Sequence, residues 1–311
     1  MKTIRIGTRA SSLAQAQSAI VASALEKGCD VKCELVPIIT SGDRRHGPLA
    51  AVGGKGLFTA ELEAALRAGT IQFAVHSAKD LPAVMGEDLT IAAVPPREDP
   101  RDALVSPSGG GVEALPRGAT VGTGSPRRAA QLLAIRVDLR VRPVRGNVET
   151  RVARALGSAG RHPPVDAVVL AMAGLNRSGL SAKHAANIHP LELDAFIPAA
   201  GQGALAVQCM AGDAESIAMG KAIDHADSHA ALISERMVAA GLAADCRSCL
   251  AVHVRHTGDL WLALGMAARP DGTDMLRVQA RGPTAQAAGS EILAQFKARM
   301  PPSYWRLTND D

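Results

Sequence analysis

The feature of this sequence that most constrains its fold is an alternation of short β-rich runs with helical segments. A strand over residues 3–8 precedes a helix for which Ser12 is the expected N-cap, with Gln15 completing a capping box. A strand over 31–39, a helix ended by Gly69 and a strand over 71–76 follow. Because such alternation places helices on the faces of a sheet, it predicts a parallel or mixed sheet.

The same alternation begins again at Thr120 and predicts a second α/β domain. The expected elements are a strand from 120, a helix from Pro126, a strand over 139–143, a helix after Asn147 and an apolar strand over 165–170. The segment 94–100 carries three prolines and several charges, which suits a linker between the two domains.

The last part of the chain predicts a small third domain of α+β type. A helix after Asp227 precedes three strands, 250–256, 260–267 and 275–280, and a final helix over 284–298. With 311 residues, 47% of them hydrophobic and 21% charged, the chain is long enough for several globular domains, and these values exclude a disordered protein.

Composition also narrows the class of partner. No signal peptide and no apolar run long enough to span a membrane is visible, so we expect a cytoplasmic protein without a membrane partner. The five cysteines are then more plausible as thiols, ligands or nucleophiles than as a disulfide framework. Only 2% of the residues are aromatic, which disfavours a stacking platform for single-stranded nucleic acid.

Positive charge is concentrated in the second domain, between Arg127 and Arg154. Arg127 and Arg128 lie in the first turn of a helix that Ser125 is expected to cap, where the helix dipole favours acids instead. Asn147 caps the next helix and is flanked by further arginines. Guanidinium groups, free backbone N–H groups and positive dipole ends together predict a carboxylate or phosphate site, with a solvated basic face as the alternative.

The sequence does not match either of two common nucleotide-binding motifs, the P-loop and the dinucleotide fingerprint. The run Gly53-Gly54-Lys55-Gly56 lacks the glycine and the Ser or Thr that a P-loop requires, at Leu49 and Gly56. In the run that begins at Gly122, Arg127 occupies the third glycine of a dinucleotide fingerprint. Binding of a polyanion such as RNA is the remaining alternative, which the basic domain supports and the few aromatic residues do not; we expect no nucleic-acid partner.

Eight motifs occur in order over most of the chain. They are Ile6-Gly7-Thr8-Arg9 with Ser11, Val52-Gly53-Gly54-Lys55-Gly56-Leu57-Phe58, His76-Ser77-Ala78-Lys79-Asp80-Leu81-Pro82, Arg97-Glu98-Asp99-Pro100-Arg101-Asp102, Gly122-Thr123 through Arg127-Arg128, Arg145-Gly146-Asn147, Ala173-Gly174-Leu175 and Pro198-Ala199-Ala200-Gly201-Gln202-Gly203. Together they closely resemble the porphobilinogen deaminase family, also called hydroxymethylbilane synthase.

The resemblance implies a fold and an activity. The fold would be two mixed-sheet α/β domains like periplasmic binding proteins, covering 1–95 with 199–216 and 101–193, and a small α+β domain over 222–311 that carries the cofactor. The activity would be a transferase of haem biosynthesis that condenses four porphobilinogens into linear hydroxymethylbilane and releases ammonia. It would use one covalently attached dipyrromethane as primer, act as a monomer and need no metal.

The resemblance also implies the site residues. Asp80 would be catalytic, by holding pyrrole N–H groups and shuttling protons, although an Asp that pairs with Lys79 or caps a turn is the alternative. A ladder of arginines complements the carboxylates of an oligopyrrole. The binding residues would be Arg9, Ser11, Lys55, Phe58, Lys79, Thr123, Ser125, Arg127, Arg128, Arg145, Asn147, Arg151, Arg177, Gln202 and Gly203. The loop with Lys55 and Phe58 suits a lid, and His76 is expected to be a packed histidine without a catalytic role.

The chain departs from the family pattern at the cofactor cysteine. It reads Ala244-Asp245-Cys246-Arg247-Ser248-Cys249, without the glycine and proline that usually flank the attachment site. Alignment assigns the attachment to Cys246, with Cys249 as the alternative nucleophile. A redox pair or half of a zinc site are other interpretations of this spacing. For the chain as a whole, the competing hypothesis is a non-catalytic two-lobed anion- or tetrapyrrole-binding protein that has lost the cofactor.

Overall fold

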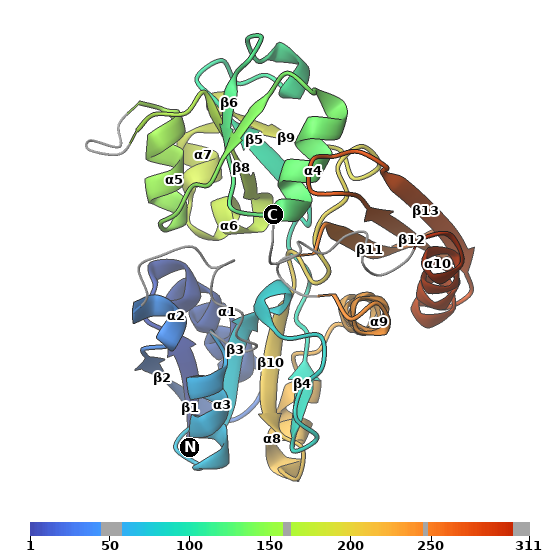
Figure 1. The fold of residues 1–311 in the computed structure, drawn as a ribbon. Helices are drawn as coiled ribbons and strands as arrows, with labels where there is room; N and C mark the ends of the chain where they lie inside the picture. Colours follow the sequence, from blue (N-terminus) through green and yellow to red (C-terminus); the bar gives the residue numbers. More distant parts are fainter. Residues whose placement is uncertain (45–57, 158–162, 245–247, 301–311) are drawn as a thin grey trace. The chain divides into compact units, whose positions relative to one another are not determined.

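The computed structural model describes residues 1–44, 58–157, 163–244 and 248–300 (Figure 1). Contacts divide the chain into two compact units. Unit 1 comprises residues 1–98 and 204–233, and unit 2 comprises 99–203 and 234–311. Lys55 and Cys246 lie outside the described residues.

Unit 1 is built on a five-stranded mixed sheet. Its strand order is β2 (Val31–Ile38), β1 (Lys2–Arg9), β3 (Phe73–Ser77), β10 (Leu205–Met210) and β4 (Leu89–Ala93). β1 pairs in parallel with β2 and β3, whereas β10 is antiparallel to β3 and β4. The chain therefore leaves this sheet after β4 and returns to it with β10, a return that the resemblance implied.

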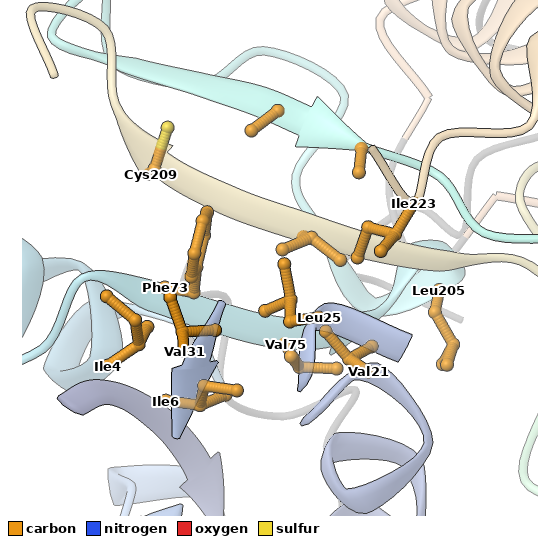
Figure 2. Close-up of a cluster of buried hydrophobic side chains, with 13 residues drawn as sticks. Ile4, Ile6, Val21, Leu25, Val31, Phe73, Val75, Leu205, Cys209 and Ile223 are labelled. Carbon is orange, nitrogen blue, oxygen red and sulfur yellow. The ribbon is translucent and has the colours of Figure 1, made fainter. Parts of the chain in front are cut away.

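The helices of unit 1 are α1 (Ser12–Gly28), α2 (Ser41–Arg44), α3 (Ala60–Arg67) and α8 (Ala214–Lys221), and a 3₁₀ turn, η2 (Ala78–Asp80), follows β3. One face of α1 packs Val21 and Leu25 against Ile4, Phe73 and other buried side chains of the sheet (Figure 2). Gly69 ends the α3 segment with φ +65°, as expected from the sequence.

The N-terminus of α1 corrects one prediction. Ser11, and not Ser12, is the N-cap, and its hydroxyl accepts a hydrogen bond from the Ala14 N–H at 3.3 Å. The predicted cap was wrong by one residue because two successive serines offer the same hydroxyl, and only the backbone conformation selects between them.

Unit 2 contains a second mixed sheet in the order β7 (Arg140–Arg142), β6 (Thr120–Gly122), β8 (Ala167–Ala171), β5 (Asp102–Val105) and β9 (Ile188–Pro190). β6 is parallel to β7 and β8, and β5 is antiparallel to β8 and β9. The accompanying helices and turns are η3 (Val112–Ala114), α4 (Pro126–Ile135), α5 (Val148–Ala155), α6 (Met172–Arg177), α7 (Leu180–Lys183) and η4 (Ala185–Asn187).

A third, antiparallel sheet of β11 (Leu250–Thr257), β12 (Leu260–Ala267) and β13 (Leu276–Gly282) also belongs to unit 2. It follows α9 (Ala226–Gly241), and α10 (Ala285–Arg299) packs against it. At Gly265 a Cβ would come within 2.6 Å of the Phe296 ring, so glycine allows α10 to approach β12 closely.

The predicted fold class is confirmed: two mixed α/β sheets and a small C-terminal region of sheet and helix. The boundaries of the three expected domains stay a prediction. The strands β4, β5, β9 and β10 were not predicted, because their short apolar runs have neither alternation nor clear turn signals. Among the described residues, the helices lack the length and apolar character needed to cross a membrane.

Candidate active site

The first group of predicted site residues lies at one edge of the sheet in unit 1. β1 and β3 are parallel neighbours, so their carboxyl ends meet at the same edge. Arg9 is the last residue of β1, and Lys79 and Asp80 follow β3 directly. The fold thus brings together two segments that are about seventy residues apart in the sequence.

The turn that carries Asp80 is anchored on both sides. The Gln17 side chain of α1 donates a hydrogen bond to the Ser77 hydroxyl at 3.0 Å, and the Ala78 N–H donates to the Ala204 carbonyl at 3.0 Å. Leu81, the next residue after the turn, is buried. Asp80 itself is exposed, so a firmly held backbone presents its carboxylate to solvent.

His76, next to this turn, has an internal role. It is buried, and its Nε2 lies 3.0 Å from Oε1 of the Gln208 side chain on the neighbouring strand β10. The prediction of a packed histidine is confirmed.

Arg9 is held by two neighbours in unit 1. Its guanidinium is ion-paired with Asp43 and lies 4.1 Å from the centroid of the Phe58 ring. Burial by itself raises the pKa of Asp43, but hydrogen bonds from Arg9 and Thr40 outweigh it and leave the pKa below its usual value. Asp43 therefore stays ionised and compensates part of the charge of Arg9.

The second group lies in unit 2, at the carboxyl ends of the parallel strands β6, β7 and β8. Thr123 follows β6, Arg145 follows β7, and Arg177 ends α6 after β8. Ser125 caps α4 and accepts from the Arg128 N–H at 3.4 Å, and Asn147 caps α5 and accepts from the Thr150 N–H at 2.8 Å, so both predicted caps are confirmed.

Arg127 and Arg128 form a buried cluster with Asp102, a residue of β5. The side chain of Asp102 is 0% exposed, and those of Arg127 and Arg128 are 5% and 8% exposed. Oδ2 of Asp102 lies 2.8 Å from Nη1 of Arg127, and Oδ1 accepts from Nε of Arg128 at 2.9 Å. Two guanidinium groups share one carboxylate, so the three side chains together carry an excess positive charge.

The pKa of Asp102 reflects this arrangement. Burial alone raises it, but the charges of Arg127 and Arg128 outweigh burial and hold the pKa at about 2, below the usual 3.8. Burial conversely lowers the pKa of Arg127. A second anion beside the two arginines would remove the imbalance of charge.

The loop of residues 201–203 connects this cluster to other parts of unit 2. The buried Gln202 side chain donates to Oδ1 of Asp102 at 3.0 Å, and the Gly203 carbonyl accepts from Arg177 at 2.7 Å. The Gly201 N–H donates to the buried Glu235 at 2.6 Å. Gly201 and Gly203 have positive φ angles of 74° and 89°, which glycine adopts without steric cost, so the loop requires glycine at both positions.

The structure thus brings the predicted residues together in two groups, Arg9, Ser11, Phe58, Lys79 and Asp80 in unit 1 and the other described residues in unit 2. Their contacts with ligands stay predictions. Asp102, Gln17 and Glu235 were not predicted as supporting residues. The sequence contains an indirect indication of Asp102, since two arginines in the first turn of a helix require a nearby carboxylate if they are buried.

Cys249 is the described member of the cysteine pair. It is 0% exposed, and burial, with a smaller effect of the Asp271 charge, raises the pKa of its thiol to about 12. A thiol reacts as its thiolate, and at neutral pH this environment suppresses the thiolate of Cys249. The structure therefore disfavours Cys249 as an attachment nucleophile.

This property of Cys249 is directly testable. In the native protein at pH 8, we expect iodoacetamide to alkylate Cys249 at least about 100-fold more slowly than in the same protein unfolded in guanidinium chloride, since both burial and thiol pKa oppose the reaction. Peptide mapping after timed quenching measures both rates. Equal rates in the two states would contradict the buried position.

The fold and these two groups of residues define an α/β protein with buried arginines around one carboxylate in unit 2 and an exposed carboxylate on an anchored turn in unit 1. A family model described as "Porphobilinogen deaminase, dipyromethane cofactor binding domain" matches residues 4–218. The chain belongs to the porphobilinogen deaminase family, and the matched domain is the one that binds the dipyrromethane cofactor.

Curated relatives match over nearly the whole chain. The porphobilinogen deaminase of Nitrobacter winogradskyi is 43% identical over 97% of this chain and 95% of its own length. That of Mycobacterium tuberculosis is 42% identical over 91% of this chain and 92% of its own. Among solved structures, the match to the periplasmic aliphatic sulphonate binding protein SsuA from Escherichia coli covers 77% of this chain and 70% of that one, at 16% identity and a TM-score of 0.40.

Proposed function

We propose that this chain condenses four porphobilinogens head to tail into the linear tetrapyrrole hydroxymethylbilane, with release of ammonia at each addition. The observation that carries the proposal is the buried pair Arg127 and Arg128, which share the single carboxylate of Asp102. Porphobilinogen bears an acetate and a propionate group, and guanidinium groups are the preferred partners of such carboxylates. Membership in the family supports the same conclusion.

The residues of unit 2 fit the dipyrromethane cofactor. Each of its pyrroles carries carboxylate side chains, and the site offers an excess of buried positive charge together with exposed Arg145. The cap residues Ser125 and Asn147 keep an O–H and an N–H₂ donor after accepting from their helices. When bound, the dipyrromethane supplies the free pyrrole carbon to which the first substrate is joined.

Asp80 is the group that we assign to proton transfer. Loss of ammonia from porphobilinogen leaves an electron-poor methylene-pyrrolenine, and positive charge develops on the pyrrole nitrogen. A carboxylate that accepts the pyrrole N–H stabilises this charge and takes up the proton that is released when the new bond forms. The anchored turn suits this role because it holds the carboxylate in place without burying it. The neighbouring Lys79 supplies a cation for a substrate carboxylate.

Cys246 is the residue to which we assign covalent attachment, although it lies outside the described residues. The high pKa and burial of Cys249 support this assignment by disfavouring the alternative. We expect the purified protein to show a mass excess of two porphobilinogens less two ammonias, and peptide mapping to locate it on Cys246.

Three outcomes of the mass measurement are informative. The adduct on Cys246, together with its loss in Cys246→Ser, would support the attachment site. The adduct on Cys249 would keep the function and refute the site. An unmodified chain from cells that make porphobilinogen would favour the binding protein that has lost its cofactor.

We also propose that the protein acts as a monomer in the cytoplasm. Sedimentation at micromolar concentration tests the monomeric state, and fractionation of cells tests the location.

A further inference from the structure

Edge strand β7 and the residues after it carry a surface of three exposed arginines, Arg140, Arg142 and Arg145, here named the β7 arginine surface. Arg140 and Arg142 are two residues apart on a strand, so they extend from the same face of the sheet. Val141, between them, packs against the hydrophobic core. The pattern therefore presents two guanidinium groups side by side at the edge of the sheet of unit 2.

Arg140, Arg142 and Arg145 have no ion-pair partner among the residues that the structure describes. Two acids near Arg140 in the sequence and the sheet are used elsewhere. Asp138 pairs with Arg136 and accepts from the Gly118 N–H, and Asp166 accepts from the Thr120 N–H. Like charges that lie close together repel one another, and an anionic ligand would relieve this repulsion.

The β7 arginine surface adjoins the second group of predicted site residues in unit 2, to which Arg145 itself belongs. The backbone carbonyl of Arg142 accepts from the Thr123 N–H at 2.9 Å, and Arg142 is paired in register with Gly122. Beyond Arg145 the chain enters α5 at its cap, Asn147. Arg140 and Arg142 thus lie on the strand that leads directly into residues to which we assign cofactor and substrate binding.

We propose that Arg140 and Arg142 extend this binding group outward and hold the carboxylates of the longer oligopyrrole intermediates. The inference rests on the proposed function. Each addition brings a further acetate and propionate, whereas the buried pair Arg127 and Arg128 can serve only a fixed set of carboxylates. Exposed guanidinium groups beside the site can bind the added carboxylates as the chain grows, without the cost of burying each new charge.

A structural role offers an alternative explanation, because charged side chains on an edge strand also prevent it from pairing with a second chain. The double variant Arg140→Gln and Arg142→Gln separates the two explanations. Its matched control is Arg117→Gln, which removes an exposed arginine of the same unit that is not one of the three residues of this surface. A second double variant, Arg140→Lys and Arg142→Lys, keeps the charge.

The experiment supplies porphobilinogen to the holoenzyme in limited amounts and follows complexes with one to four added units by native mass spectrometry. For the Gln pair we expect normal cofactor content and early additions at the wild-type rate, with the last additions slowed about tenfold. Arg117→Gln should stay within about twofold of wild type at every step. The Lys pair should recover part of the lost rate, because it restores positive charge at both positions but not the geometry of the guanidinium group.

Several results would overturn the inference. If the Gln pair adds all four units at wild-type rates but begins to self-associate, the two arginines only protect the edge strand from pairing with a second chain. Equal slowing of all four additions would assign the arginines to the first binding event instead. Loss of salt-sensitive polynucleotide binding with unchanged additions would identify a nucleic-acid surface. A wild-type chain that adds no porphobilinogen would refute the proposed function itself, an outcome distinct from the others.

Discussion

Replacing Asp80 with asparagine should lower kcat by a factor on the order of 10² to 10⁴ while KM for porphobilinogen changes little. The amide oxygen of Asn can still accept the pyrrole N–H, so binding is retained. It can neither carry the negative charge that stabilises the developing cation nor take up the proton. Steady-state assays of porphobilinogen consumption and ammonia release measure both constants, and titration of the cofactor checks that the variant is still loaded.

Two further variants control this experiment. Asp80→Glu keeps the carboxylate on the same turn and should recover part of the activity. Glu87→Gln removes an exposed charge elsewhere in unit 1 and should leave kcat unchanged. Turnover of Asp80→Asn within about twofold of wild type would remove Asp80 from the mechanism.

The second large effect is expected on stability, for Asp102→Asn. This change leaves the buried guanidinium groups of Arg127 and Arg128 without their counter-ion. Removing one partner of a buried ion pair costs about 3–5 kcal/mol, because the remaining charge stays desolvated. Urea unfolding followed by circular dichroism measures the free energy of unfolding.

The pH dependence gives an independent check. The pKa of Asp102 is lowered from 3.8 to about 2 in the folded protein, so its carboxylate contributes its full stabilisation above the unfolded pKa. That contribution, roughly 2–3 kcal/mol from the size of the shift, is lost as the pH falls through the range between the two values. We therefore expect the difference between wild type and Asp102→Asn to be constant near neutrality and to shrink below about pH 4.

Asp259→Asn provides the matched control, since Asp259 is an exposed acid of the same unit. It should change the free energy of unfolding by less than about 0.5 kcal/mol. If Asp102→Asn is as stable as this control at pH 7, the ion pairs of the buried cluster do not contribute to the free energy of unfolding as their geometry indicates.

Much of the local structure could be predicted from the sequence because it depends on neighbouring residues. Ser125 and Asn147 cap their helices as expected, since an N-cap requires only a side-chain oxygen and a free N–H two or three residues later. The N-cap of α1 was predicted at Ser12 instead of Ser11 because the two neighbouring serines offer equivalent hydroxyl oxygens. The strand β10 could not be predicted in its place, since its partners β3 and β4 precede it by more than one hundred residues.

The candidate site, too, could be predicted from the sequence only in part. Motifs identify Asp80 and the arginines as residue types suited to a polycarboxylate pyrrole, and the comparisons place the chain in the corresponding family. The sequence does not reveal that Arg127 and Arg128 are buried, because exposed and buried arginines look alike in a helical pattern. It also does not show that Gln17 anchors the turn of Asp80 from a different element.

By itself, the sequence determined the alternation of strands and helices, the helix caps, the family and the chemical type of the ligand. All of these depend on residue identity and short spacing. Only the tertiary structure decided that Asp102 neutralises one of two buried arginines, that Glu235 holds the Gly201 backbone, and that Cys249 is a buried thiol of high pKa. These properties depend on desolvation and on contacts between distant segments, which arise when the sheets assemble.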